Sequence, residues 1–443
     1  MMQTSAPLER ADLIGRYERL RARSNALFSL LSDEVYYTAP IAARHPIVFY
    51  EGHLPAFSFN TLVKKALGGA SIDPRLEALF ARGIDPDEGA SDRRKPFAWP
   101  ERDVVRQFVD EADRRVLDAL AHADLDVPGH PLLDRAEAVH AILEHEAMHQ
   151  ETLLYMWHRL PLAQKRRPAD YRPAVDGRIP EQEWVDVPEG TATLGVDRDA
   201  IAFGWDNEFG ARREHVPAFS VERYDVTNAA FLEFVEAGGY DEPRWWTPED
   251  WAWRSRENLT HPLFWERDGD DWYWRGMFEC IPLPPSWPVY VSQAEAAAYA
   301  RWRGARLLTE AEFQRAAYGT SSGDEQPYPW GPAVPGPGHG VFDFASWDPQ
   351  PVGSHPGGRS AWGVDDLVGN GWEWTGTVFG PFPGFRAMAS YPEYSADFFD
   401  GQHVVMKGAS PATARELLRP TFRNWFRTRY PFVYATFRCA RSA

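Results

Sequence analysis

The spacing of apolar residues predicts helices in the first part of the chain. Within residues 1–165, apolar side chains recur every three or four positions, which places them on one face of an α-helix. This period is clearest in Leu13–Leu27 and Val105–Leu120, and it also runs through Phe49–Val63. A fourth helix follows Asp134, which we expect to cap its N-terminus. Four long helices predict an all-α bundle, in whose core facing side chains can assemble a metal site.

The pattern is different after residue 184. Short apolar runs such as Ala192–Leu194 alternate with turns rich in Trp, Gly and Pro, which is typical of strands joined by loops. Two helices are expected among them, at Asn228–Ala237 and at Ser292–Trp302. Ser292 opens the second of these, and Glu295 follows three residues later, as in a capping box. This part of the chain predicts a loop-rich α+β domain.

A polar, proline-rich stretch separates the two patterns. Its composition is typical of a linker, and we place the linker at residues 166–184. We therefore predict an N-terminal domain at residues 1–165 and a C-terminal domain at residues 185–443. A chain of 443 residues is longer than one hydrophobic core usually covers, so two domains agree with its length.

The charge balance restricts the kind of partner. Lys and Arg number 47 and Asp and Glu number 64, for a net charge of −17. A chain this acidic is a poor match for nucleic-acid phosphates or for a membrane surface bound through basic residues. Small organic substrates are the expected partners, with no nucleic acid and no membrane.

The cysteine content and the hydropathy indicate a compartment. Cys280 and Cys439 are the two cysteines of the chain, which predicts a reducing environment without a disulfide framework. Cys439 falls in the final apolar strand, where we expect a core residue. The sequence has no signal-peptide pattern at its start and no apolar run of about eighteen residues. We expect a cytoplasmic protein.

One predicted helix carries a potential metal site. Its sequence His145-Glu146-Ala147-Met148-His149 places two imidazoles four residues apart, on one face and within reach of one ion. The same motif occurs in zinc hydrolases, where the intervening glutamate is the general base. That interpretation needs a third ligand, and the position that would supply it in one protease class is Tyr155. Glu181 and Glu183 are alternative ligands for another class, and two solvated histidines are the plain structural alternative.

The C-terminal part contains a set of distinctive segments. They are Tyr224-Asp225-Val226-Thr227-Asn228, Val291-Ser292-Gln293-Ala294-Glu295-Ala296, Arg306-Leu307-Leu308-Thr309-Glu310-Ala311-Glu312, Gly369-Asn370-Gly371-Trp372-Glu373-Trp374-Thr375 and Phe437-Arg438-Cys439. This part resembles the formylglycine-generating-enzyme-like or sulfatase-modifying-factor domain, whose fold is C-type-lectin-like, and the N-terminal part resembles a DinB-like four-helix bundle. The pair is similar to the ergothioneine, ovothiol and selenoneine synthases, so the resemblance covers nearly the whole chain.

The resemblance implies a metal centre. In these families the helical domain supplies three histidines to a mononuclear non-haem Fe(II), and the matching residues are His53, His145 and His149. Three neutral nitrogen ligands leave positions for dioxygen and for a chalcogen donor, which agrees with other non-haem iron oxygenases. Glu146 would then lie outside the ligand set.

The resemblance also implies a binding site for hercynine, the trimethylated histidine. Asn424, Trp425 and Phe426 match the residues that hold it in those families. The residue types suit this ligand, since aromatic faces bind a quaternary ammonium and Asn can bond a carboxylate. Further residues expected at the substrates are Phe379 and Phe382 in the same cavity, and Arg93 and Arg94 for charged groups of the donor. For the two arginines, a solvated basic turn remains an alternative.

Two departures from the family pattern bear on the donor. Related enzymes place a proton-donating tyrosine at one of two positions, and this chain has Phe379 and Phe97 there. We therefore favour a selenoneine synthase that couples a selenosugar to hercynine, since selenols ionise and oxidise more readily than thiols. The alternative is a sulfoxide synthase that uses cysteine or γ-glutamylcysteine. A zinc hydrolase based on His145, Glu146 and His149, and a non-catalytic binding protein, are the hypotheses from other classes.

Overall fold

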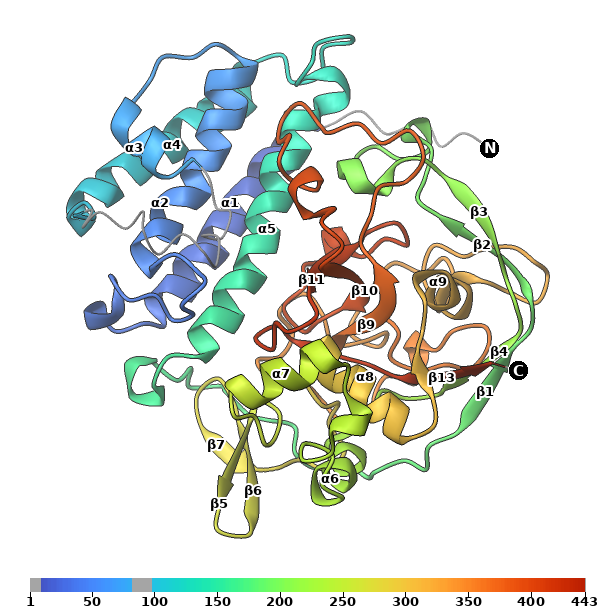
Figure 1. Ribbon diagram of the computed structural model, residues 1–443. Helices are drawn as coiled ribbons and strands as arrows, with labels where there is room; N and C mark the ends of the chain where they lie inside the picture. Colours follow the sequence, from blue (N-terminus) through green and yellow to red (C-terminus); the bar gives the residue numbers. More distant parts are fainter. Residues whose placement is uncertain (1–8, 82–97, 443) are drawn as a thin grey trace. The chain divides into compact units, whose positions relative to one another are not determined.

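The computed structural model describes residues 9–81 and 98–442 and divides the chain into two compact units (Figure 1). Unit 1 consists of Met1–Ala169 together with Met388–Tyr391. Unit 2 consists of Asp170–Ala387 and Pro392–Ala443. The predicted domain limits, with a linker at 166–184, stay a prediction.

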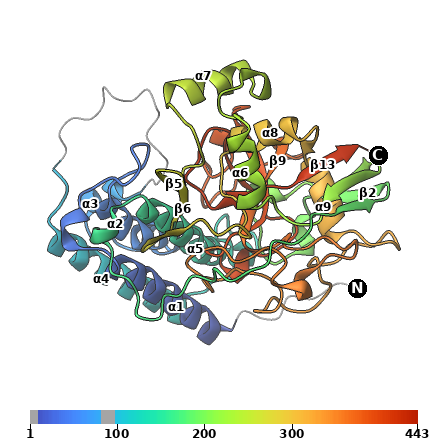
Figure 2. The ribbon, with the colours of Figure 1, turned by 90° about the horizontal axis from the view of Figure 1, so that it is seen from below.

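Unit 1 is helical. Its helices are α1 (Arg10–Ser29), α2 (Ile47–Ser58), α3 (Pro74–Leu79), α4 (Arg102–His122) and α5 (Glu137–His158). A π-helical segment, Phe59–Ala66, continues α2. Helix α1 packs on α4 and α5, and α2 packs on the same two helices, so the four long helices lie side by side (Figures 1 and 2). The predicted all-α four-helix bundle is confirmed.

The apolar period of the sequence corresponds to buried faces. In α1, the residues Leu13, Tyr17, Leu20 and Leu27 are buried while most of the intervening positions remain accessible. Helix α5 is buried over most of its circumference, since it packs against both α1 and α2. Inside a helix with so little exposed surface, a polar side chain without a partner costs free energy.

The prediction that Asp134 caps α5 is wrong. Residues Asp134–Ala136 form a separate 3-10 turn, in which Arg135 and Ala136 have φ angles of 57° and 55°. This left-handed pair prevents the turn from continuing into α5, which begins at Glu137. The Asp134 carboxylate instead accepts a hydrogen bond from the amide of Gly129 at 3.1 Å.

In its described residues, unit 2 contains four small sheets and four α-helices. Two four-stranded sheets have the orders β1-β4-β13-β8 and β11-β10-β9-β12, and β2-β3 and β5-β6-β7 form the others. The strands are β1 (Trp184–Val187), β2 (Gly190–Leu194), β3 (Arg212–Val216), β4 (Phe219–Glu222), β5 (Trp265–Asp268), β6 (Asp271–Arg275), β7 (Cys280–Pro282), β8 (Arg306–Leu307), β9 (Gly371–Val378), β10 (His403–Ala409), β11 (Asn424–Arg427), β12 (Ala435–Thr436) and β13 (Cys439–Ser442). The helices are α6 (Asn228–Glu236), α7 (Pro248–Arg256), α8 (Gln293–Trp302) and α9 (Glu310–Tyr318). The predicted loop-rich α+β fold is confirmed, as is the capping box between Ser292 and Glu295.

A buried charge network joins the distinctive segments of unit 2. Arg438 is 1% exposed and donates to Glu373 on β9 at 2.7 Å and to Asp225 at 3.0 Å. Asp366 is also buried, and its carboxylate accepts a hydrogen bond from the Gly353 amide at 2.6 Å. Burial raises the pKa of Asp366 to about 6. Arg438, Glu373 and Asp225 come from three of the distinctive segments, so these segments are joined by buried hydrogen bonds.

The structure shows where the two cysteines lie and whether any helix could span a membrane. Cys280 is exposed and Cys439 is buried, and neither is in a disulfide. Burial raises the pKa of the Cys439 thiol, as expected of a core residue. In the described part of the chain, no helix combines the length and the apolar character needed to span a bilayer.

Candidate metal centre and substrate-binding residues

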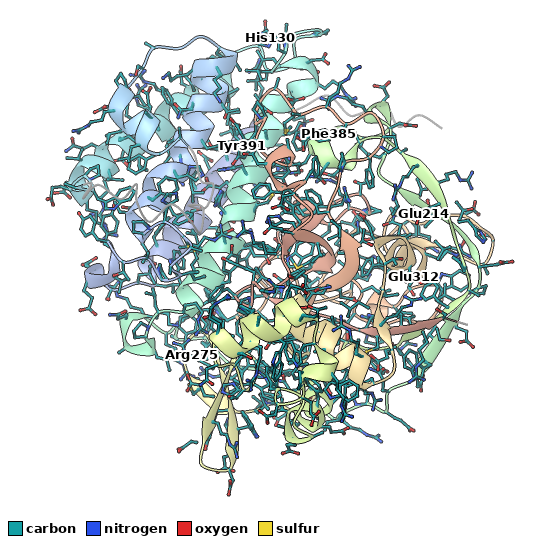
Figure 3. The ribbon with its side chains drawn as sticks, viewed as in Figure 1. His130, Glu214, Arg275, Glu312, Phe385 and Tyr391 are labelled. Carbon is teal, nitrogen blue, oxygen red and sulfur yellow. The ribbon has the colours of Figure 1, made fainter. Side chains whose placement is uncertain are left out.

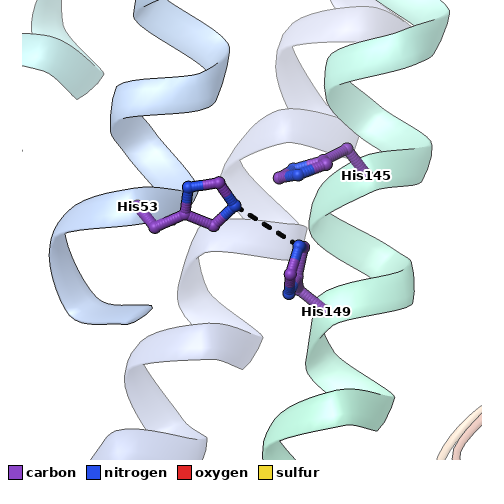
Figure 4. A group of neighbouring side chains, drawn as sticks. All are labelled: His53, His145 and His149. Carbon is purple, nitrogen blue, oxygen red and sulfur yellow. Dashed lines mark hydrogen bonds between the residues drawn. The ribbon is translucent and has the colours of Figure 1, made fainter. Parts of the chain in front are cut away.

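Three histidines of unit 1 converge. His53 lies on α2, and His145 and His149 lie one turn apart on α5 (Figure 4). Each offers one ring nitrogen, and these three atoms lie within 4.8 Å of one another. The Nε2 atoms of His53 and His149 are 3.3 Å apart. Within residues 9–81 and 98–442, this is the one group of three potential metal ligands of this kind.

A backbone carbonyl orients His53. Its Nδ1 lies 2.7 Å from the carbonyl oxygen of Phe80, which can only accept, so Nδ1 carries the proton and donates. The other nitrogen, Nε2, is then an unprotonated donor atom that faces the other two histidines (Figure 4). This arrangement is the usual one for a histidine that binds a metal.

The chemistry of the three imidazoles fits a metal ion. His53 and His145 are buried and His149 is half-buried. Burial lowers the pKa of His53 to about 4, and it also holds the pKa of His145 and His149 well below the ordinary value. All three are therefore neutral at pH 7, which is the form that binds metals.

Buried ring nitrogens without hydrogen-bond partners also indicate a metal ion at this site. Among the described residues, neither ring nitrogen of His145 has a hydrogen-bond partner, nor has Nδ1 of His149, although these atoms are buried. A buried polar atom without a partner costs free energy, and a metal ion bound by the three rings would remove part of that cost. The residues present fit a metal held by three neutral nitrogens.

Aromatic rings surround the cluster. Phe57 stacks on His145 with ring centroids 3.5 Å apart and an interplanar angle of 9°. Phe49 stacks on His53 at 5.0 Å and 18°. These walls keep water away from the imidazoles and hold the local dielectric constant low, which explains the direction of the pKa shifts.

The Glu146 side chain is engaged elsewhere. It is 1% exposed, its Oε1 lies 2.9 Å from a guanidinium nitrogen of Arg21, and it accepts the Ser24 hydroxyl at 2.5 Å. Arg21 also binds Asp113 at 2.9 Å. A glutamate held in this network on the α1 side of α5 is not placed to serve as the general base of a zinc hydrolase. In unit 2, Glu183, one alternative zinc ligand, pairs with Arg223.

The predicted hercynine residues lie on two faces of β11. Trp425 stacks on Phe379 with centroids 4.3 Å apart and an interplanar angle of 6°. Neighbours along a strand point to opposite faces, so Asn424 and Phe426 share the other face, where Phe426 stacks on Tyr430 at 5.1 Å. The structure therefore brings Trp425 and Phe379 together and sets Phe426 apart from them.

Phe382 lies in the core of unit 2. It is 4% exposed and belongs to the buried cluster that includes Val187 and Leu194. Arg423 lies over its ring at 4.2 Å and forms a two-bond ion pair with Glu310. Arg93, Arg94 and Phe97 lie outside the described residues.

Comparisons with known proteins agree with this two-part architecture. The sulfatase-modifying factor enzyme 1-like domain matches residues 172–443, and the DinB superfamily matches residues 16–153. A protein named hercynine oxygenase from Mycolicibacterium thermoresistibile is 36% identical over 365 residues, which cover 80% of this chain and 77% of that protein. The chain belongs to the ergothioneine synthase superfamily. The resemblance found in the sequence is confirmed, and the chain, as a member of this superfamily, is an enzyme.

Two further relatives extend the match. Hercynine oxygenase from Mycolicibacterium smegmatis is 40% identical over 295 residues, which cover 64% of this chain and 67% of that protein. Ergothioneine biosynthesis protein 1 from Neurospora crassa is 27% identical over 497 residues, which cover 93% of this chain and 55% of that protein. The chain thus spans about half the length of this fungal member of the ergothioneine synthase superfamily.

The sequence did not predict several residues that contact the candidate site residues of unit 1 or of unit 2. Arg21 and Ser24 lie on the buried face of α1, and a charged residue on an apolar stripe was the signal that could have marked them. Phe80 acts through its carbonyl, which no side-chain pattern reveals. In unit 2, Tyr394 lies 5.1 Å from Trp425, edge to face, and only its density of aromatic neighbours hints at a role.

Proposed function

We propose that this chain is an Fe(II)- and O2-dependent synthase that joins selenium or sulfur to an imidazole carbon of hercynine, with a selenosugar as the preferred donor. The observation that carries the proposal is the set of three neutral histidines whose ring nitrogens converge within 4.8 Å. Membership of the ergothioneine synthase superfamily supports this choice over other uses of a three-histidine site.

His53, His145 and His149 would hold the metal. A ferrous ion bound there would supply electrons to dioxygen and bind the chalcogen donor at its open positions. Because the three ligands are uncharged, they leave the positive charge of the ion available to attract an ionised selenol or thiol. The ring of His53 is held for this role by the Phe80 carbonyl.

Residues of unit 2 would hold hercynine. Trp425 offers an aromatic face for the trimethylammonium group, and Phe379 supports its ring from one side. The side-chain oxygen of Asn424 already accepts a hydrogen bond from the Trp425 amide at 2.9 Å. Its amide nitrogen is then oriented to donate to a carboxylate. Asn424 and Trp425 lie on opposite faces of the edge strand β11, so one hercynine would have to lie across the free edge of that strand to reach both groups.

The electron balance defines the product class. Joining the chalcogen to the ring removes one hydrogen from the imidazole carbon and one from the donor, and it releases two electrons and two protons. Reduction of O2 to the oxidation level of water takes four electrons, so oxidation of the chalcogen to its oxide supplies the other two. One oxygen atom enters the product, and the second leaves as water with the two protons.

The phenyl ring of Phe379 supports the selenosugar as donor. Related enzymes have a tyrosine at this position, and the ring here stacks on Trp425 without a hydroxyl group. A selenol is ionised and oxidised more readily than a thiol, so it depends less on a phenol that assists proton transfer. The names of the relatives, hercynine oxygenase and ergothioneine biosynthesis protein 1, favour the second candidate, a sulfoxide synthase that uses cysteine or γ-glutamylcysteine.

A donor competition tests the proposal. The purified chain is loaded with Fe(II) and supplied with O2, hercynine and equal concentrations of a selenosugar, cysteine and γ-glutamylcysteine, and the products are resolved by mass. We expect the hercynyl selenium product to predominate. Sulfur products alone would establish the second candidate, and no product from any donor, despite full iron loading, would refute both.

Matched variants test whether the three histidines bind the iron that product formation requires. His145→Ala should abolish both iron binding and product formation. His122→Ala is the control, because His122 lies on α4 with a 76% exposed side chain. Tightly bound zinc in the purified protein, together with peptide cleavage that is lost in Glu146→Gln, would instead establish a hydrolase.

A further inference from the structure

Four residues from the C-terminal part of the chain belong to unit 1. Met388–Tyr391 are grouped with the helices, although the residues before and after them belong to unit 2. Met388 is 5% exposed and Ser390 is 1% exposed. The Ser390 hydroxyl donates a hydrogen bond of 3.1 Å to Glu137, the first residue of α5. We refer to Met388–Tyr391 as the strap.

The last residue of the strap lies against a proposed metal ligand. The ring centroid of Tyr391 is 6.1 Å from that of His145, at an interplanar angle of 67°. It is also 5.2 Å from the centroid of Phe57, the residue that stacks flat on His145. Figure 3 labels Tyr391 beside α5. His145 thus has one aromatic ring stacked on it and a second ring packed edge to face.

His145 differs from His53 in what holds its ring. A carbonyl fixes His53, whereas neither nitrogen of His145 has a hydrogen-bond partner among the described residues. Metal-binding histidines usually have such a bond on the second nitrogen, which fixes the rotation of the ring. Among the described residues, the rings of Phe57 and Tyr391 pack on His145 beside the two other histidines, and aromatic pairs of this geometry attract each other.

The contacts of Phe57 and of the strap explain how both rings reach His145. Phe57 belongs to α2 and reaches one face of His145 from within the helical bundle. Tyr391 comes from a segment more than two hundred residues away in the chain, and its hydrogen-bonded neighbour Ser390 anchors it to α5. The bond from Ser390 joins the same helix that carries His145, so the strap and the ligand keep a fixed relation.

We propose that Tyr391 is a positioning residue of the metal centre: its ring, anchored through Ser390 and Glu137, fixes the orientation of His145. The helical unit then has its full metal affinity only when the strap is in place. This inference rests on the proposed function, because it requires the three histidines to bind a metal.

The experiment uses the full chain, freed of metal, and Co(II) as the probe. The affinity is measured by competition with a chelator, and the visible absorption of bound Co(II) reports the geometry of its ligands. Tyr391→Ala should bind Co(II) about tenfold more weakly and shift the absorption, as loss of a supporting residue does. Tyr391→Phe keeps the ring and should restore both properties to those of the unchanged protein.

Two further variants complete the set. Ser390→Ala removes the anchor and should change affinity and spectrum in the same direction as Tyr391→Ala. Tyr273→Ala is the control, because Tyr273 is a half-buried tyrosine on β6 in unit 2, and it should leave Co(II) binding unchanged. If Tyr391→Ala does not fold, as judged by circular dichroism, Tyr391→Leu replaces it.

The outcomes separate this inference from the proposed function. Tight Co(II) binding by the unchanged protein, with the same affinity and spectrum in Tyr391→Ala or Tyr391→Leu, would overturn the role of Tyr391 and leave the metal centre standing. Equal losses in Tyr391→Phe and Tyr391→Ala would also overturn it, since the hydroxyl rather than the ring would then matter. Failure of the unchanged protein to bind Co(II) or Fe(II) would refute the proposed function itself.

Discussion

A single methyl group added at Gly52 should weaken the metal centre. Gly52 precedes His53 on α2, and a Cβ atom built there would lie 2.6 Å from two ring carbons of Phe80. Phe80 is fully buried, and its carbonyl oxygen accepts a hydrogen bond from Nδ1 of His53 at 2.7 Å. Gly52→Ala must therefore displace the residue that orients one of the three proposed ligands.

The geometry sets the size of the effect. The Phe80 ring would have to retreat by about 0.8 Å to reach an ordinary contact distance of 3.4 Å. Overpacking of this kind costs about 1–3 kcal/mol, while alanine in place of glycine within a helix gains at most about 1 kcal/mol. Loss of the bond that supports a metal ligand weakens metal binding about 10–100-fold. We expect a net loss of about 1–2 kcal/mol in the stability of the metal-free protein, and at least tenfold weaker metal binding.

Two assays and one control decide the matter. Chemical unfolding of the metal-free protein followed by circular dichroism gives the stability, and competition with a chelator gives the affinity for Fe(II) or Co(II). Gly15→Ala is the matched control, because Gly15 lies within α1 and a Cβ atom there meets only the flexible end of Arg19 at 3.1 Å. It should raise stability by several tenths of a kcal/mol and leave affinity unchanged. Gly52→Ala with the affinity and stability of the unchanged protein would show that the Phe80 carbonyl does not hold His53.

Two further predictions concern buried charges. Arg21→Met leaves the buried Glu146 without its cation and should lower the free energy of unfolding by about 3–5 kcal/mol, measured by chemical unfolding. The double variant Arg21→Met with Glu146→Gln should recover part of this loss. A double variant as unstable as the two single losses combined would contradict this. Because burial raises the pKa of Asp366 from 3.8 to about 6, the folded state binds the proton more tightly than the unfolded state, and stability should fall as the pH rises from about 4 to about 6. At about 1.4 kcal/mol for each pKa unit, Asp366 contributes roughly 3 kcal/mol to this fall. Thermal unfolding across this range should show a smaller slope in Asp366→Asn, and an unchanged slope would assign it to other carboxyl groups.

The helices could be predicted because their signal is local. The apolar period in Leu13–Leu27 indicates one buried face, which is the face that α1 packs against its neighbours. The start of α5 could not be predicted in the same way. Asp134 is a suitable capping residue, but the left-handed Arg135 and Ala136 follow it, and nothing in their side chains requires that conformation.

The proposed ligands divide in the same manner. His145 and His149 stand four residues apart on one helix, so their proximity follows from helical geometry. His53 belongs to another helix, and only a family resemblance could place it beside them. Tyr391 could not be found at all, because its approach to His145 depends on the path of a chain segment that no local pattern determines.

The separation of Glu146 from the metal ligands follows from the geometry of α5. Successive residues of an α-helix are turned by about 100°, so a glutamate directly after His145 points well away from the direction that His145 and His149 share. In zinc hydrolases with this motif, that glutamate is the general base. Here α1 packs against α5 on that side and supplies Arg21 and Ser24 to the carboxylate, which is 1% exposed. The same five-residue motif therefore places a carboxylate at a hydrolytic site in one fold and commits it to helix packing in this one, and the deciding residue is the arginine on the neighbouring helix.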